Sequence, residues 1–163
     1  MTLLFGRARE AKRLADKSVA VVPHFIDGRI LKGITNDFYP TRPCFHVVPK
    51  SGHGLYVRIS DLKAVFFVRN LDGDSERGDL KGFIAAPRDS QRGRKLAVRF
   101  RDSELICGYS LGYAPHRQGF FMFPADTGSN NLRVYVITAA AAEIREGPAA
   151  EELAQRILNS RAA

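Results

Sequence analysis

Short apolar stretches separated by turn-forming residues run through most of the chain. The first two, Ala20–Ile26 and Arg29–Thr35, flank Asp27-Gly28. Asp-Gly between two apolar stretches is a strong hairpin signal, because a type I′ turn needs a positive φ at both central residues. The pattern therefore predicts an antiparallel pair of strands near the start of the chain.

This pattern occurs twice. The segment His24–Pro49 aligns with Arg99–Pro124 at a constant offset of 75 positions, without a gap. Beyond the next loop the offset becomes 77, so that Val57 aligns with Val134 and Ile59 with Val136. A repeat of this length predicts one structural unit used twice. We call residues 19–68 unit A and residues 94–146 unit B. Aligned pairs include Phe25 with Phe100, Asp27 with Asp102, Gly33 with Gly108, Phe38 with Tyr113, Pro40 with Pro115 and Arg42 with Arg117.

Each unit has enough apolar stretches for five short strands. Gly33 and Gly108 fall inside the second strand of their units, where glycine is typical of a bend or bulge in a small barrel. Asp102-Ser103 is a weaker turn signal than Asp27-Gly28, so we expect a longer or distorted turn there. The predicted fold class is mainly β, with two tandem five-stranded small barrels of the SH3/Sm-like type. Their later strands are expected at Cys44–Val48, Leu55–Ile59, Ala64–Val68, Phe120–Phe123, Leu132–Ile137 and Ala140–Arg145.

One of these strands is less regular. Thr138–Glu143 contains four consecutive alanines and has high helix propensity. By analogy with Ser60–Phe67 in unit A, we expect a turn and a strand there instead.

The segments outside the two units differ in composition. Residues 1–18 predict a basic N-terminal helix, and residues 147–163 predict a C-terminal helix, with Pro148 suited to its first turn. Residues 69–93 are rich in Gly, Asp and Arg and predict an exposed linker. Its apolar segment Phe83–Ala86 is a candidate docking point.

The order of turn and core residues resembles the Sm-like family. The resemblance covers residues 19–68 and 94–146 and consists of a strand, Asp-Gly, a strand with a glycine, an aromatic residue and an apolar strand. RNA-binding Sm proteins carry Asp-x-x-x-Asn in the following loop, where this chain has Tyr39 with Pro43 and Ala114 with Gln118. The resemblance therefore implies the fold, without that family's uridine pocket.

A second resemblance concerns Leu62–Asp74, which is similar to small domains that accompany PilZ modules in bacterial regulators. PilZ modules bind cyclic di-GMP through Arg-x-x-x-Arg and a later Asp/Asn-x-Ser-x-x-Gly. Arg9 with Arg13 and Arg88 with Arg92 have the first spacing, but the second motif is missing from its expected place. Signalling linked to a cyclic dinucleotide is therefore the weakest of the alternatives for function.

Charge and cysteine content narrow the class of protein. The net charge is +8, a balance that favours polyanions such as nucleic acid but also a solvated surface. No apolar run approaches the ~20 residues of a membrane span. Two cysteines, Cys44 and Cys107, cannot form a disulfide framework, so we expect a bacterial-type cytoplasm.

The sequence holds little that indicates catalysis. Cys44 and His46 share a strand face, but a closed zinc site needs four ligands, so we expect no metal. Ser60 and Lys63 match Ser-x-x-Lys without the accompanying elements of that motif. Phosphate-loop and dinucleotide fingerprints are missing from the sequence. We therefore expect no cofactor and no enzyme activity.

Five loop residues are the candidates for binding: Tyr39, Arg42, Tyr113, His116 and Arg117. Aromatic and arginine side chains there would stack on bases and neutralise phosphates. Alternatively, the aromatic rings fill the core and the arginines brace the loops. We expect a non-enzymatic regulatory module that acts as a protein-interaction adaptor, and the alternative is RNA or DNA binding through a basic face.

Overall fold

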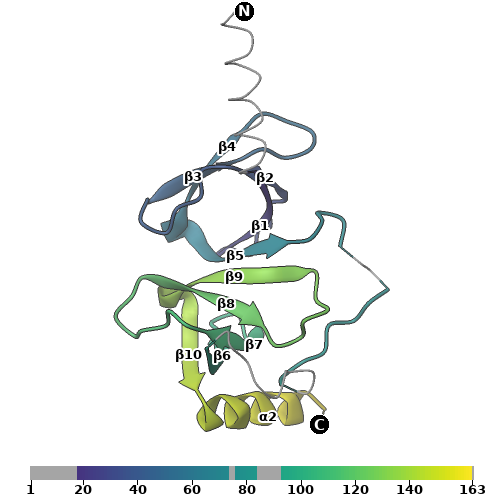
Figure 1. Ribbon diagram of the computed structural model, residues 1–163, viewed down its shortest axis with the longest axis vertical. Helices are drawn as coiled ribbons and strands as arrows, with labels where there is room; N and C mark the ends of the chain where they lie inside the picture. Colours follow the sequence, from purple (N-terminus) through teal and green to yellow (C-terminus); the bar gives the residue numbers. More distant parts are fainter. Residues whose placement is uncertain (1–17, 74–75, 84–92, 163) are drawn as a thin grey trace, which may run out of the picture.

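The computed structural model describes residues 18–73, 76–83 and 93–162. It consists of ten strands, two short 3-10 helices and a C-terminal α-helix (Figure 1). The predicted N-terminal helix falls, apart from Ser18, outside the described residues. The elements are β1 (Val19–Phe25), β2 (Gly33–Thr35), β3 (Cys44–Val47), β4 (Leu55–Arg58), η1 (Ile59–Asp61), β5 (Leu62–Val68), β6 (Arg94–Phe100), β7 (Leu105–Ser110), β8 (Gly119–Pro124), β9 (Asn131–Ile137), η2 (Thr138–Ala140), β10 (Ala141–Glu146) and α2 (Pro148–Ala162).

The strands form two antiparallel sheets. Eight of them have the order β10-β6-β7-β8-β9-β5-β1-β2, and β3 pairs with β4 in the second sheet. The units are joined edge to edge, since β5 of unit A pairs with β9 of unit B, with Val65 opposite Tyr135. The mainly β class is confirmed. Two closed barrels are not confirmed, because neither sheet closes on itself and the larger sheet runs through both units.

Strand pairing follows the sequence repeat through the first half of each unit. Val19 pairs with Thr35 as Arg94 pairs with Ser110, both 75 positions further along. Gly33 and Gly108 are needed at equivalent close approaches. A Cβ on Gly33 would lie 2.5 Å from the carbonyl oxygen of Val48, and a Cβ on Gly108 would lie 2.1 Å from that of Phe123. The glycines therefore let the next strand approach closely, whereas the bulge that the sequence predicted is not present in their pairing with β1 and β6.

In the second half of each unit, the predicted offset of 77 between the repeats is wrong. Phe45 pairs with Val57 in unit A, and its equivalent Phe120 pairs with Val136 in unit B. Val57 therefore corresponds to Val136, at an offset of 79 rather than 77. The two 3-10 helices, η1 and η2, have the same separation of 79. The irregular segment after β9 forms η2 and β10, so the expected turn and strand are confirmed.

The first hairpin turn of each unit also differs from the prediction. Phe25 N–H donates to the Arg29 carbonyl, and Phe100 N–H donates to the Glu104 carbonyl, so three residues form each turn. In each, one residue has positive φ, Gly28 at 94° and Ser103 at 74°. A type I′ turn, with two such residues, was therefore the wrong assignment. Three-residue loops that end in a left-handed residue are the next common hairpin type, and unit B has the same turn rather than a longer one.

The two units share their hydrophobic cores. One core combines residues of unit A with Tyr135 and Ile137 on the outer side of β9. The other combines residues of unit B with Phe66 and Val68 on the outer side of β5. Lys63, where β5 bulges, adds ion pairs to Asp102, at 2.6 Å, and Glu104 in unit B. Each unit therefore covers a sheet face of the other.

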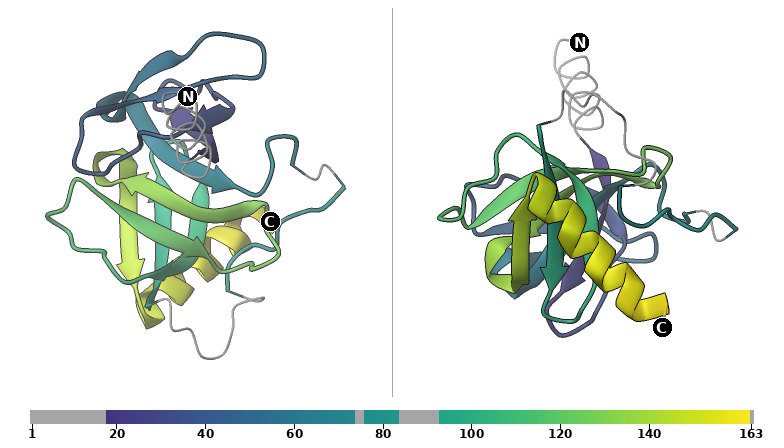
Figure 2. Two further views of the ribbon diagram at one scale, coloured as in Figure 1. Left: turned by 45° about the horizontal axis from the view of Figure 1, so that its top comes forward. Right: turned by 90° about the horizontal axis from the view of Figure 1, so that it is seen from below.

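Helix α2 covers a third face, the side of unit B that is turned away from unit A. Leu153, Ala154 and Ile157 of α2 pack on Ala97 and Leu105. Figure 2 shows α2 lying across β6 and β7, the strands that contain Ala97 and Leu105. Ala97 is the repeat equivalent of Val22 in unit A, and Val22 packs into the core of unit B. Helix α2 therefore covers the face of unit B that is equivalent to the face of unit A covered by unit B.

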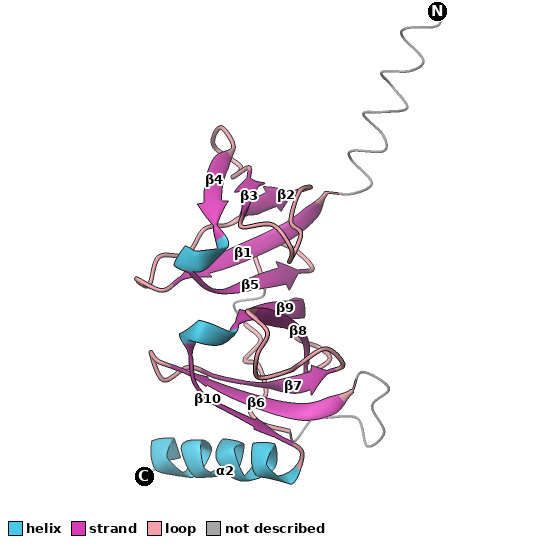
Figure 3. Ribbon diagram, turned by 90° about the vertical axis from the view of Figure 1, so that its left-hand side faces the viewer, coloured by secondary structure: helices cyan, strands magenta, loops and turns pink. Residues whose placement is uncertain are grey.

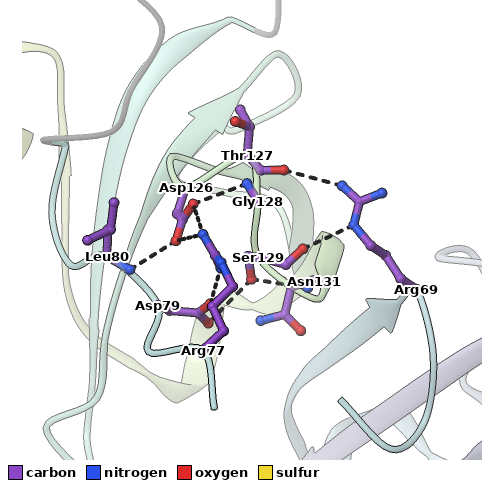
Figure 4. A network of polar contacts seen from close by, with 9 residues as sticks. All are labelled: Arg69, Arg77, Asp79, Leu80, Asp126, Thr127, Gly128, Ser129 and Asn131. Carbon is purple, nitrogen blue, oxygen red and sulfur yellow. Dashed lines mark hydrogen bonds and ion pairs between the residues drawn. The ribbon is translucent and has the colours of Figure 1, made fainter. Parts of the chain in front are cut away.

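Most described residues of the linker are exposed, and the segment is anchored to unit B at Asp126. The carboxylate of Asp126, in the loop between β8 and β9, accepts hydrogen bonds from Arg77, at 2.8 and 2.9 Å, and from Leu80 N–H (Figure 4). Hydrogen bonds from Arg77 lower the pKa of Asp126. Phe83 packs against the α2 cluster and is not a free docking point. Residues 84–86 of the predicted docking segment lie outside the described residues.

Candidate binding surface

The predicted binding residues lie in two equivalent loops, between β2 and β3 and between β7 and β8. Arg42 N–H donates to the carbonyl of Tyr39, and Arg117 N–H donates to that of Ala114, both at 3.0 Å. The Arg42 guanidinium lies over the Tyr39 ring, 4.4 Å from its centroid. His116 and Arg117 are exposed. Across the described residues, no hydrogen bond, ion pair or ring contact joins the two loops, so the structure does not assemble one site from them.

Tyr113, the fifth predicted residue, packs against the core. Its ring lies 4.8 Å from Phe120, just as the ring of Phe38 lies 5.0 Å from Phe45 in unit A. Burial raises the pKa of Tyr113. Its contacts match the core interpretation rather than base stacking.

The surface that distinguishes the units is the outer side of β3 and β4. Tyr56 and Tyr135 are repeat equivalents, yet 65% of Tyr56 is exposed and 4% of Tyr135. Tyr135 is covered by Phe38 and Phe121, with ring centroids 5.3 and 5.0 Å away. Val48 is also about half exposed, and so is Leu55, which precedes Tyr56 and lies on the other face of β4 at the end of the strand. We call Cys44, His46, Val48, Leu55, Tyr56 and Arg58 the hairpin surface.

The hairpin surface includes an open sheet edge. Ile59 N–H donates to the Pro43 carbonyl, and at the equivalent place Thr138 N–H donates to the Gln118 carbonyl, both at 2.9 Å. Because successive residues of a strand direct their backbone groups to opposite sides, those of Tyr56 and Arg58 face away from β3. In unit B the corresponding side of β9 is paired with β5. In the described structure β4 has no strand on that side.

Polar contacts hold the hairpin surface in place. Asp37 accepts hydrogen bonds from His46 N–H, at 2.8 Å, and from Thr35, and its other oxygen lies 2.7 Å from His46 Nδ1. Burial alone would raise the pKa of Asp37, but the hydrogen bonds from His46 and Thr35 outweigh it and lower that pKa. The Cys44 thiol raises the pKa of Tyr56. His46 is therefore oriented by a carboxylate beside the exposed ring of Tyr56, 5.4 Å away.

Other sequence candidates gain no support from the described residues. Within these ranges, no group of three His, Cys, Asp or Glu side chains is arranged to hold a metal ion. The paired arginines Arg9 with Arg13 and Arg88 with Arg92 lie outside the described residues. Burial raises the pKa of the Cys107 thiol to about 12, which disfavours its reactive thiolate. No described helix is long and apolar enough to cross a membrane.

Sequence reasoning missed the hairpin surface although a signal was present. Tyr56-Val57 and Tyr135-Val136 are the same dipeptide, followed by Arg58 in unit A and Ile137 in unit B. Aligned at 79, a polar residue replaces an apolar one on the outer side of the strand. That contrast indicates that the two outer sides have different surroundings.

The family of unknown function DUF6982 matches residues 17–146, so the chain belongs to this family. The match covers units A and B and ends before α2. Neither the curated proteins nor the solved structures contain a match to the chain.

Proposed function

We propose that this member of the DUF6982 family is a non-enzymatic protein-interaction module that binds an extended segment of a partner protein along the outer edge of β4. Strand addition at an open sheet edge is a common mode of peptide recognition, in which backbone hydrogen bonds supply affinity and side-chain contacts supply specificity. One observation carries the proposal. The equivalent edge in the same molecule, that of β9, is already filled by a strand, β5.

The β5–β9 junction indicates the chemistry of the partner segment. Opposite Val134, Tyr135 and Val136 lie Phe66, Val65 and Ala64. In β4, the repeat equivalents of Val134 and Tyr135 are Leu55 and Tyr56, and both are exposed. An extended segment with apolar residues at these positions would cover them and pair with the backbone of Tyr56 and Arg58. We therefore infer a short apolar strand as the occupant.

The finer description of the fold belongs to the same proposal. The five strands of each unit are connected in the same order, β5-β1-β2-β3-β4 and β10-β6-β7-β8-β9, with a single bridge between β2 and β3. We propose that each is an open form of the SH3/Sm-like small barrel, in which the outer edge of the fourth strand, β4 or β9, is available for pairing with a further strand. The equal registers and the paired glycines support this.

Nucleic-acid binding is the second candidate. Among the described residues, Arg42 and Arg117 make no ion pair, and both are exposed. Phosphate contacts from such side chains give affinity that falls steeply with salt. Fluorescence anisotropy with labelled RNA and DNA at about 50 and 200 mM salt tests this candidate. Salt-sensitive binding that drops in the Arg42→Ala/Arg117→Ala double variant would favour it over the partner strand.

The test of the partner strand uses a photo-crosslinking amino acid at Tyr56 of the full chain, expressed in its own host. A protein adduct is expected at this position, and it should be lost when Leu55→Lys is added. Leu111→Lys is the matched control, because Leu111 is an exposed leucine in a loop of unit B. A synthetic peptide of the crosslinked segment should then slow hydrogen exchange of the Tyr56 and Arg58 amides. An adduct that survives Leu55→Lys, or a peptide that leaves these amides unprotected, would contradict the proposal.

A further inference from the structure

A hollow lies where the two units meet, away from the edge of β4. Its volume is about 550 Å³, within the usual range for small-molecule sites. Unit A lines it from β1, β5, the end of β2 and the loop after β2, and unit B lines it from β8 and β9. Four of the nine lining residues are aromatic, and the lining consists of Val19, Thr35, Asn36, Phe38, Tyr39, Pro40, Phe67, Phe121 and Arg133. We call this hollow the junction pocket.

Arg133 is the charged residue of the junction pocket. Its guanidinium lies 4.5 Å from the ring centroid of Phe67 and 4.6 Å from that of Phe121. Stacking on aromatic rings fixes the guanidinium plane and leaves its N–H groups at the rim of that plane. Partial burial lowers the pKa of Arg133, but an arginine remains charged at neutral pH.

Arg133 has no counter-charge in the described part of the chain. No described carboxylate or carbonyl accepts a hydrogen bond from it, in contrast to Arg77, Arg99 and Arg156, which are all paired with carboxylates. Asp37, two residues from Thr35, is engaged by Thr35 and His46. Holding a cation partly out of water without an anion costs free energy, which an oxyanion in the pocket would recover.

The repeat shows that this arrangement is specific to the junction. The equivalent of Arg133 in unit A is Gly54, and the equivalents of Tyr39 and Phe67 in unit B are Ala114 and Glu146. Neither unit alone carries both the aromatic wall and the cation. The cation and the aromatic wall therefore come together only where the two units join.

We propose that the junction pocket binds a small organic anion, whose carboxylate or phosphate pairs with Arg133 and whose flat apolar body lies against Phe38, Tyr39 and Phe121. A guanidinium presents parallel N–H donors that match the two oxygens of either group. The aromatic wall selects ligands that carry a ring rather than a bare inorganic ion. This site does not depend on the strand-binding proposal, since it shares no residue with the hairpin surface.

The experiment is an NMR titration of the full chain, observing the Arg133 side-chain Nε–H and the amides of Tyr39 and Phe121. Four probes separate the contributions: phenyl phosphate, phenylacetate, inorganic phosphate and benzyl alcohol. Phenyl phosphate or phenylacetate should bind at least about tenfold more tightly than either inorganic phosphate or benzyl alcohol, because only they use both the cation and the aromatic wall. Which of the two binds more tightly distinguishes a phosphate ligand from a carboxylate ligand.

Variants decide whether Arg133 is responsible. Arg133→Gln should weaken binding by about tenfold or more, and Arg133→Lys, which keeps the cation but not its flat fork, should weaken it less. Arg94→Gln, at an exposed arginine of β6, is the control and should bind as the parent does. Equal affinity for inorganic phosphate and phenyl phosphate, no saturable shift at Arg133, or equal binding by the Gln and Lys variants would each overturn the proposal.

Discussion

Units A and B have the same order of strands, but different faces of the two units are covered by the rest of the molecule. In unit B, the outer side of β8 and β9 is covered by unit A, and the far side of β6 and β7 is covered by α2. In unit A, the far side of β1 and β5 is covered by unit B, while the outer side of β3 and β4 is open. Figure 3 places that hairpin and α2 at opposite ends of the molecule. A duplicated unit thus produces three covered faces and one open face.

Strands β4 and β10, which each lie at an outer edge of their unit, also differ. Strand β10 carries Glu143, Arg145 and Glu146 and is interrupted by a bulge between Ala141 and Glu143. Charges and bulges protect sheet edges from unwanted pairing. Strand β4 has three uncharged residues, Leu55, Tyr56 and Val57, followed by Arg58, and no bulge in its register with β3. The difference teaches that one edge is defended while the other is left able to pair.

The largest expected effect tests the contrast between Tyr135 and Tyr56. Tyr135→Ala should lower the free energy of unfolding by about 3 to 4 kcal/mol, because a buried aromatic ring leaves a cavity in a shared core. Tyr56→Ala should change it by less than about 0.5 kcal/mol, because its ring is exposed. Urea unfolding of both variants measures the difference. Similar losses in both would show that the outer side of β4 is covered in solution.

The next effect tests whether α2 covers unit B as unit B covers unit A. Leu153→Ala should lower the free energy of unfolding by about 2 to 4 kcal/mol, since Leu153 is buried against Ala97 and Leu105. Gln155→Ala, at an exposed position of the same helix, is the control and should stay within about 0.5 kcal/mol. Thermal or urea unfolding checks both. A loss in Leu153→Ala no larger than in the control would mean that α2 adds little to unit B.

The smallest effect tests the equivalence of the two hairpin turns. Ser103→Gly should raise the free energy of unfolding by about 0.5 to 1 kcal/mol, because Ser103 has the positive φ that Gly28 adopts without strain. Gly28→Ser should lower it by about 1 kcal/mol for the same reason. Urea unfolding again provides the measurement. Destabilisation by Ser103→Gly would show that the serine side chain contributes more than its backbone strain costs.

In the first half of each unit the hairpin and the equivalence of the two units could be predicted, though not the type of turn, because the constraints there are local. Gly33 and Gly108, and the Asp27 and Asp102 turns, restrict the backbone at fixed spacings. The later offset could not be determined from pattern alone. Shifting a strand by two residues keeps every side chain on its own face, so offsets of 77 and 79 give the same apolar alternation around Val57. The pairing of Val57 with Phe45 and of Val136 with Phe120 separates them.

The candidate sites were harder to predict because they depend on which strands meet. The loops with Tyr39, Arg42, His116 and Arg117 contain aromatic and basic residues that suit binding in any fold. Sequence reasoning therefore selected these loops as the candidate site. Whether Tyr56 is exposed depends on β4 lacking the neighbour that β9 has, which is a contact between distant segments. Arg133 carried a partial signal, since it alternates with Tyr135 and Ile137 on one side of an apolar strand. Its stacking on Phe67 requires the junction of the two units.

The two units pair through different strands, the fifth strand of unit A (β5) and the fourth strand of unit B (β9). Because each unit has both kinds of strand, further units could in principle pair at either end of the molecule. Here the charges and bulge of β10, with α2 packed beside it, terminate the series at one end. On the strand-binding proposal, β4 is the remaining site of pairing among the described residues. The protein would then add one partner strand and form a defined complex instead of a growing fibre.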